Sequence, residues 1–379
     1  MTETPTEQPS GTPVETNQAP PVPAAGAPRW RLAFALLALV VIALSVTSLS
    51  TGSSGRTHPA ESFQLFLAWL SGAEGAGGFT SGELHVFELR FMRVLTAIGV
   101  GAALALSGAL LQGVFRNDLA SPSVLGLTTG ASVGASLVLL LSGGLGPSGL
   151  PAGALTPWVL TASAFASALG VAVLVAAVAS RGGRVSVATL LLVGIATNAT
   201  LGGLLTLVQR LALEDFEVAR ALIVWSFGTI DDRLVSQVVS LFSVLGLCLF
   251  AVPFLATELD LFAGGEDDAA ALGVHTTRVK LLALATASLA AAAAVAVSWQ
   301  IGFIGLVVPH LLRRLVGRSH RVLLPACLLG GPCLLLGVDL LGRVAFARYD
   351  LPPGVLMSLI GGPFFFFLLL SSRDASRTF

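Results

Sequence analysis

Ten apolar runs, most of them close to twenty residues long, dominate this sequence and restrict the class of fold that it can adopt. A helix needs about 20 apolar residues to cross the hydrocarbon core of a bilayer, where its backbone hydrogen bonds must all be internal. The chain is only 11% charged, against about 25% in soluble domains. We therefore predict an all-α polytopic membrane protein of about ten transmembrane helices. The runs cover residues 32–49, 93–115, 124–141, 158–179, 187–208, 234–255, 281–297, 301–316, 323–341 and the stretch after Pro353 up to Leu370.

The apolar runs divide the chain into one membrane domain and two tails. Residues 1–28 are rich in Pro, Thr, Glu and Ala and contain no aromatic residue, so we predict a disordered tail. Residues 29–373 form the predicted membrane domain, followed by a short tail at 374–379. A cleavable signal peptide is the alternative for the first run, but its length and the polar tail before it favour a permanent span.

The basic residues predict the orientation of the chain. Ten spans place both ends on one side of the membrane. On that side lie thirteen of the 21 basic residues, and eight lie on the other. Because positive loops stay in the cytoplasm, we predict cytoplasmic termini in a cell membrane. The eight external arginines still need a reason.

No motif in the sequence supports an enzyme. H-E-x-x-H and G-x-S-x-G are absent. A phosphate-binding P-loop needs Gly-Lys-Ser/Thr, but the only lysine, Lys280, follows Val279. If ATP drives this chain, the ATPase must therefore be another polypeptide. The three cysteines have no metal-ligand spacing and are interpreted as packing residues, so no metal is expected.

Asp339 stands near the end of an apolar run, where a carboxylate is costly unless it is paired or functional. Arg343 follows four residues later on the same helical face. A structural ion pair is the preferred interpretation, and a proton relay is the alternative. His310, which follows Pro309, is interpreted as a packed or capping residue.

The stretch from Thr257 to Lys280 is a polar interruption in the apolar sequence. Its middle, from Asp267 to Leu272, predicts a short helix that Gly273 ends in a left-handed conformation. Asp267 and Asp268 suit the positive end of the helix dipole. The segment is either a solvated loop or a contact for a protein outside the membrane.

Several motifs together resemble the FecCD family, the permeases of ABC importers for iron–siderophore complexes, haem and cobalamin. They are ELRFMRV (88–94), SGALLQGVFRNDLASPSVLG (107–126), WSFG (225–228), GFIGLVVPHLLRRLVGRSHRVLLP (302–325), VDLLGR (338–343), LPPGV (351–355) and GGPFF (361–365). The resemblance covers about residues 31–372. Met92 and Asp118 stand where the family usually has proline.

The resemblance implies a type II ABC importer permease fold and a defined set of partners. These are a second copy or a related permease, two cytoplasmic ATPase subunits and an external substrate-binding protein. ATP and Mg belong to the ATPase, and no cofactor is expected on this chain. An iron–siderophore cargo is favoured over haem and cobalamin. An ion-coupled secondary transporter is the alternative, and it would need more buried ionisable residues and inverted repeats.

The resemblance also implies roles for particular residues. Arg90, Arg93 and Arg343 would meet carboxylates of the binding protein, and interfacial anchoring is their alternative role. The 209–225 segment is the expected outer gate. The residues expected to couple the chain to the ATPase are Glu266, Asp267, Asp268, Ala269, Leu272 and Gly273, with Ala270 and Ala271 allowing close approach. Pathway or structural roles are expected for Gln112, Asn117, Pro122, Gly126, Trp225, Pro309, His310 and Asp339.

Overall fold

Helices make up nearly all of the ordered structure. The computed structural model describes residues 29–52, 55–56, 58–71, 79–142, 156–181, 184–185, 187–349 and 351–375. The predicted tail at 1–28 lies outside the described residues, as do residues 376–379 of the predicted 374–379 tail. The helices, in chain order, are α1 (Arg29–Ser50), α2 (Pro59–Ser71), α3 (Ser81–Phe115), the 3-10 helix η2 (Pro122–Leu125), α4 (Leu127–Leu141), α5 (Thr156–Ala179), α6 (Val187–Ala212), α7 (Phe216–Ser226), α8 (Val235–Phe262), α9 (Glu266–Ala271), α10 (Thr276–Ser298), α11 (Ile304–Val316), α12 (His320–Ala345) and α13 (Pro353–Ala375).

The all-α polytopic prediction is confirmed. Within the described ranges, seven helices are long and apolar enough to cross a membrane: α1, α3, α5, α6, α8, α10 and α12. The other three predicted spans correspond to the shorter α4 and α11 and to α13. The described residues also include two antiparallel pairs of two-residue strands, β1 (Thr51–Gly52) with β2 (Gly55–Arg56), and β3 (Ser180–Arg181) with β4 (Arg184–Val185).

The third span, predicted to start at about residue 124, starts three residues later, at Leu127. Pro122 begins the separate 3-10 helix η2, and Gly126 takes a left-handed φ of 80° before α4 starts. The second span also differs, because α3 begins at Ser81, well before the predicted Arg93. There the Thr80 side chain accepts from the Glu83 backbone N–H, and the Glu83 carboxylate accepts from Thr80 N–H. This capping box fixes a polar helix start that hydropathy alone does not detect.

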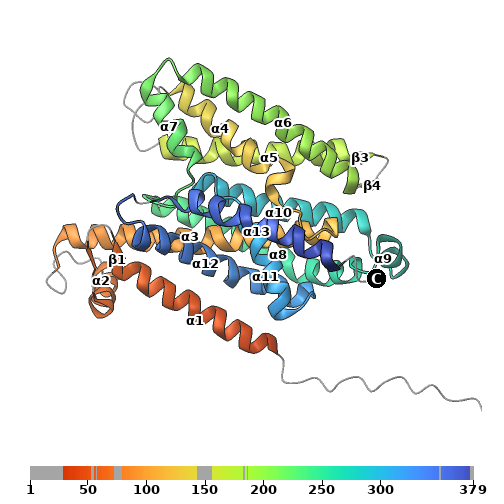
Figure 1. Cartoon of the computed structure of the whole chain (residues 1–379), viewed down its shortest axis with the longest axis horizontal. Coiled ribbons are helices and arrows are strands. Elements are labelled where there is room, and N and C mark those ends of the chain that lie inside the picture. Colours follow the sequence, from red (N-terminus) through yellow and green to blue (C-terminus); the bar gives the residue numbers. More distant parts are fainter. Residues whose placement is uncertain are drawn as a thin grey trace, which may run out of the picture.

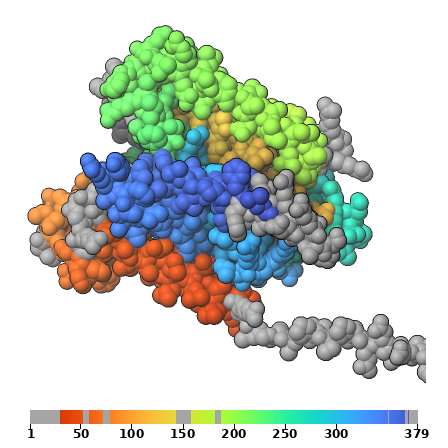
Figure 2. All heavy atoms as spheres, in the orientation of Figure 1, coloured from red at the N-terminus to blue at the C-terminus, as the bar shows by residue number. Residues whose placement is uncertain are grey.

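Helices α3 and α10 form the centre of the bundle. In their most apolar windows, 89% of α3 residues and 78% of α10 residues are buried, against 6% in α1 and 11% in α6. Figure 1 shows α1 and α6 along opposite edges of the molecule, and the same two helices form its outer surfaces in Figure 2. Their exposed apolar side chains are suited to lipid or to another membrane subunit.

Small residues allow the central helices to approach closely. A Cβ atom added at Gly108 of α3 would lie 1.8 Å from the Gly305 carbonyl oxygen at the start of α11. One added at Gly331 of α12 would lie 2.0 Å from the Gly101 carbonyl oxygen of α3. Backbone therefore packs against backbone at both crossings, as is common between helices in membranes.

The helix connections define two ends of the bundle. At the α9 end, α3, α8 and α11 finish and α10 and α12 begin; at the α7 end, α1, α6, α10 and α12 finish and α3 and α8 begin. Figure 1 places α9 at one side of the molecule and α2 with β1 at the other. The α7 end includes helix α7 itself, which Asp215 caps by accepting from the backbone N–H groups of Glu217 and Val218.

Candidate functional site

A buried charge cluster joins α3 and α12 at the α7 end. Asp339 is 1% exposed and lies between Arg93 of α3 and Arg343 of its own helix. Its Oδ1 accepts from Arg93 Nε at 3.0 Å and Nη2 at 2.8 Å, and its Oδ2 accepts from Arg343 Nε at 3.1 Å and Nη2 at 2.8 Å. The predicted ion pair with Arg343 is confirmed. Arg93, far away in sequence, is the second partner that the sequence did not identify.

The same cluster extends to α1 and to the segment before α8. Arg343 donates to the carbonyl oxygens of Ser48 at 3.3 Å and Thr51 at 2.5 Å. Arg93 also forms an ion pair with Asp231. Two arginines and two aspartates thus neutralise one another, as buried charges require.

This geometry changes how the three arginines predicted to dock a binding protein are interpreted. The Arg93 and Arg343 side chains are 16% and 7% exposed, and both already bind carboxylates of this chain. Their ion pairs inside the bundle account for the presence of two of the external arginines without a contact to a binding protein. The docking role expected of them is therefore not visible in this conformation.

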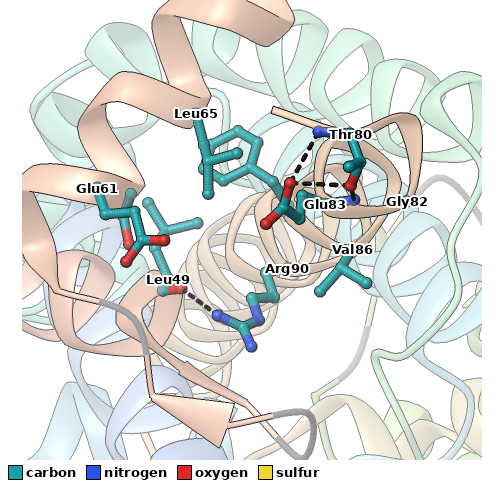
Figure 3. Close-up of a pocket in the computed structure, with 10 residues that line it drawn as sticks. Leu49, Glu61, Leu65, Thr80, Gly82, Glu83, Val86 and Arg90 are labelled. Carbon is teal, nitrogen blue, oxygen red and sulfur yellow. Dashed lines mark hydrogen bonds between the residues drawn. The ribbon is translucent and has the colours of Figure 1, made fainter. Parts of the chain in front are cut away.

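Arg90 occupies a different position, on the wall of a cavity of about 490 Å³ at the α7 end. Figure 3 shows Arg90 of α3 pointing toward Leu49 at the end of α1, with Glu83 on its own helix and Glu61 across the cavity on α2. Its Nη1 donates to the Leu49 carbonyl oxygen at 3.2 Å. Of the three arginines, Arg90 has the most suitable position for contacting a partner at this end.

Trp225 belongs to an aromatic layer at the α7 end rather than to an exposed segment. It is 2% exposed, and its ring centre lies 5.0 Å from that of Trp299. The Arg233 guanidinium lies 4.3 Å from the centre of the Trp299 ring. Burial lowers the pKa of Arg233 to about 10, which still leaves it charged near neutral pH. Trp299 was missed because nothing in the local sequence links it to Trp225.

The 107–126 motif forms a fixed joint at the α9 end. Gln112 donates to the Gly305 carbonyl oxygen at 3.2 Å and accepts a hydrogen bond from Arg313. Asn117 forms a turn in which its side chain accepts from Leu119 N–H at 2.9 Å. Asp118, which replaces the usual proline, forms an ion pair with Arg313 at 3.3 Å. The departure from the family pattern therefore carries a specific contact.

Pro309 and His310 lie inside α11. Pro309 is buried, and His310 is half-buried with its ring 6.2 Å from that of Phe364. This edge contact agrees with the interpretation of His310 as a packed residue. Among the residues that the structure describes, no three His, Cys, Asp or Glu side chains could together hold a metal ion.

The predicted short helix between α8 and α10 is confirmed. Helix α9 covers Glu266–Ala271, and Gly273 follows with a φ of 88°. Asp267, Asp268 and Ala270 are exposed, and Leu272 is 69% exposed.

Two of the residues predicted to contact an ATPase, Ala269 and Glu266, make contacts within this chain. Ala269 is 0% exposed and packs in the core of this chain, so its surface is not available to a partner. The Glu266 carboxylate accepts from Lys280 Nζ at 2.5 Å. This ion pair fixes α9 to the start of α10. The surface that α9 presents therefore consists of its acidic residues, including the 47% exposed Glu266, and of Ala270, Ala271 and the following Leu272.

Comparison with known proteins places this geometry in context. The sequence model of the FecCD transport family matches residues 36–371. The "Hemin transport system permease protein HmuU" of Yersinia pestis is 37% identical over 92% of this chain and 97% of its own length. The "Cobalamin import system permease protein BtuC" of Halobacterium salinarum is 38% identical over 76% of this chain and 73% of its own.

A solved structure has the same fold. It is described as an "inward-facing conformation" of a "metal-chelate type ABC transporter". It superimposes with a TM-score of 0.72 at 28% sequence identity, covering 90% of this chain and 99% of that one.

Proposed function

The chain belongs to the FecCD transport family of ABC importer permeases, and on that premise we propose that it moves a metal chelate into the cytoplasm. The observation that supports this cargo class most directly is the match to a hemin permease along 97% of that protein's length. The ferric siderophore predicted from the sequence remains a prediction, because the named relatives carry haem or cobalamin.

The proposed orientation places the α9 end in the cytoplasm. It rests on the excess of basic residues predicted for that side and on the positive-inside rule. The α7 end would then face a substrate-binding protein, with Arg90 as the residue that contacts one of its carboxylates. A guanidinium suits this role because it can donate two parallel hydrogen bonds to a carboxylate.

The proposed contact with a separate ATPase is the exposed surface of α9. Leu272 supplies apolar area, Ala270 and Ala271 allow a close approach, and Gly273 sets the turn into α10. The ion pair between Glu266 and Lys280 would transmit a displacement of α9 to α10. Because α10 is central to the bundle, a force on α9 would reach the helices around any central pathway.

Uptake by cells tests the proposal. We expect deletion of this chain to abolish uptake of one labelled chelate among hemin, a ferric siderophore and cobalamin, and re-expression to restore it. If only cobalamin uptake were lost, the cargo would be cobalamin, and both iron chelates, hemin and the ferric siderophore, would be excluded. Unchanged uptake of all three, with the chain verified in the membrane of the complemented strain, would refute the proposed cargo class.

A further inference from the structure

A polar cavity of about 240 Å³ lies at the α9 end, where the end of α3, the segment after α8 and the turn between α11 and α12 meet. Arg116, Arg313, Arg318 and His320 line it together with Asp118. Three arginines and one aspartate give the lining a formal charge of +2 before His320 is counted. The site is therefore suited to an anion.

Arg313 forms the fixed wall of the cavity. Its side chain is 9% exposed, and it donates to Gln112 and pairs with Asp118 at 3.3 Å. Gln112 is itself held by the Gly305 carbonyl oxygen. A buried guanidinium anchored in this way keeps its direction without the entropy cost of ordering a surface side chain.

Arg116 and Arg318 supply the charge that is not neutralised. Both are exposed, and neither forms an ion pair or a side-chain hydrogen bond within the described part of the chain. Arg116 has a left-handed backbone, with φ 48° and ψ 36°. Glycine and asparagine occupy this conformation with little strain. The arginine therefore places a charge at a position where the backbone favours a smaller residue.

His320 lies on the inner wall of the cavity. Its side chain is 8% exposed, and its Nδ1 lies 2.9 Å from the Asp260 carboxylate, which can only accept. The other ring nitrogen, Nε2, is buried and has no hydrogen-bond partner. A buried polar atom without a partner costs about 1–3 kcal/mol. Nε2 has no surface open to the cavity and lies beside Gly113, where an added Cβ would be 2.8 Å away, so this atom does not by itself identify a ligand.

We infer that this cavity is a binding site for a phosphate group. Phosphate offers several acceptor oxygens to Arg116, Arg313 and Arg318, and guanidinium groups bind it through paired hydrogen bonds.

The size of the cavity agrees with this ligand. A water molecule occupies about 30 Å³ in the liquid, so the cavity has room for about eight waters. A phosphate group and part of its hydration shell fit in that space, whereas a folded protein segment does not. The group can belong to a soluble phosphate or to a phosphomonoester lipid such as phosphatidic acid.

The test measures binding to the full chain in nanodiscs of phosphatidylcholine. Inorganic phosphate is titrated by calorimetry at constant ionic strength, with chloride as the balancing anion. We expect saturable binding of phosphate that chloride does not reproduce. A second arm replaces part of the lipid with phosphatidic acid. Loss of phosphate binding there identifies the lipid headgroup as a ligand, and unchanged binding identifies a soluble phosphate.

Two variants test the residues. Arg116→Asn removes a charge and leaves a residue that suits the left-handed backbone, and Arg318→Gln removes the second charge. Each should weaken phosphate binding about tenfold or more, because a hydrogen bond to a charged group contributes at least that much. Arg321→Gln is the matched control, since Arg321 is an exposed arginine nearby that does not line the cavity. It should bind phosphate as the native chain does.

Three results would overturn the inference. They are the absence of saturable phosphate binding, equal effects of phosphate and chloride, and native affinity in both Arg116→Asn and Arg318→Gln. The experiment uses no transport readout, so its result is independent of the proposed cargo.

Discussion

Removing the charge of Asp339 should destabilise the bundle more than its single side chain suggests. Asp339→Asn keeps the shape of the residue but leaves Arg93 and Arg343 buried with only one aspartate, Asp231, between them. Breaking a buried ion pair from one side costs about 3–5 kcal/mol. We expect the lower part of that range, because Arg93 retains Asp231 and Arg343 retains the carbonyl oxygens of Ser48 and Thr51.

A second substitution shows whether the cost comes from the unpaired charge. Arg343→Gln alone should cost about 1–2 kcal/mol, since it removes one ion pair of Asp339 but leaves that carboxylate paired with Arg93. In the double variant Asp339→Asn/Arg343→Gln the cluster is neutral again, with Arg93 paired to Asp231. Its loss should be smaller than the sum of the two single losses by about 1–3 kcal/mol.

The measurement is the free energy of unfolding of the purified chain in detergent, from denaturant titrations of the three variants. Asp339→Asn combined with Arg210→Gln is the control, because Arg210 is exposed at the end of α6, outside the cluster. That pair should be additive within about 0.5 kcal/mol. If the cluster pair were equally additive, the explanation from charge balance would be refuted.

Three further predictions concern the packing, the coupling and the docking. Gly108→Ala should lower the free energy of unfolding by about 1–3 kcal/mol, because its Cβ atom would lie 1.8 Å from a backbone oxygen. Gly170 has open space around its Cα atom, so Gly170→Ala should raise the free energy of unfolding by up to about 1 kcal/mol. Gly273→Val forces a β-branched residue into a φ of 88°, so in the assembled transporter ATP hydrolysis should continue while uptake falls. Arg90→Glu should weaken docking of the binding protein and change its salt dependence.

The controls for these predictions use the same assays. A destabilising Gly170→Ala would show that helix packing is tighter than the open space implies. Normal uptake by the Gly273→Val variant would refute the coupling role of α9 and leave it as a loop that only connects α8 to α10. Equal docking affinity of Arg90→Glu and the native chain across salt concentrations would exclude Arg90 from the interface.

Periodicity and motif order predicted most of the fold but not all of its boundaries. The long helices follow from apolar runs, and α9 follows from its acidic start and from Gly273. The errors in the predicted helix boundaries lie where polar contacts or backbone conformation, and not hydropathy, set the end of a helix. Thr80 and Glu83 extend α3 beyond its apolar part, and Gly126 separates η2 from α4.

The candidate site was only partly predictable. The ion pair of Asp339 with Arg343 is local, because four residues span one helical turn. The second arginine on Asp339 and the pairing of Trp225 with Trp299 join distant segments, and no spacing rule connects them. Ala269 illustrates the reverse error, since an alanine on a short polar helix gives no sign that its own chain buries it.

The sequence by itself determined that this chain is a helical membrane protein of the FecCD type. Hydrocarbon permits only internally bonded backbone, so apolar run lengths suffice to identify the spans, and the ordered motifs identify the family. Only the tertiary structure decided which charged side chains form ion pairs within the chain and which do not. That outcome depends on which helices cross: packing brings Asp339 between two arginines, and it leaves Arg116 and Arg318 on the wall of a cavity with no ion pair in the described part of the chain.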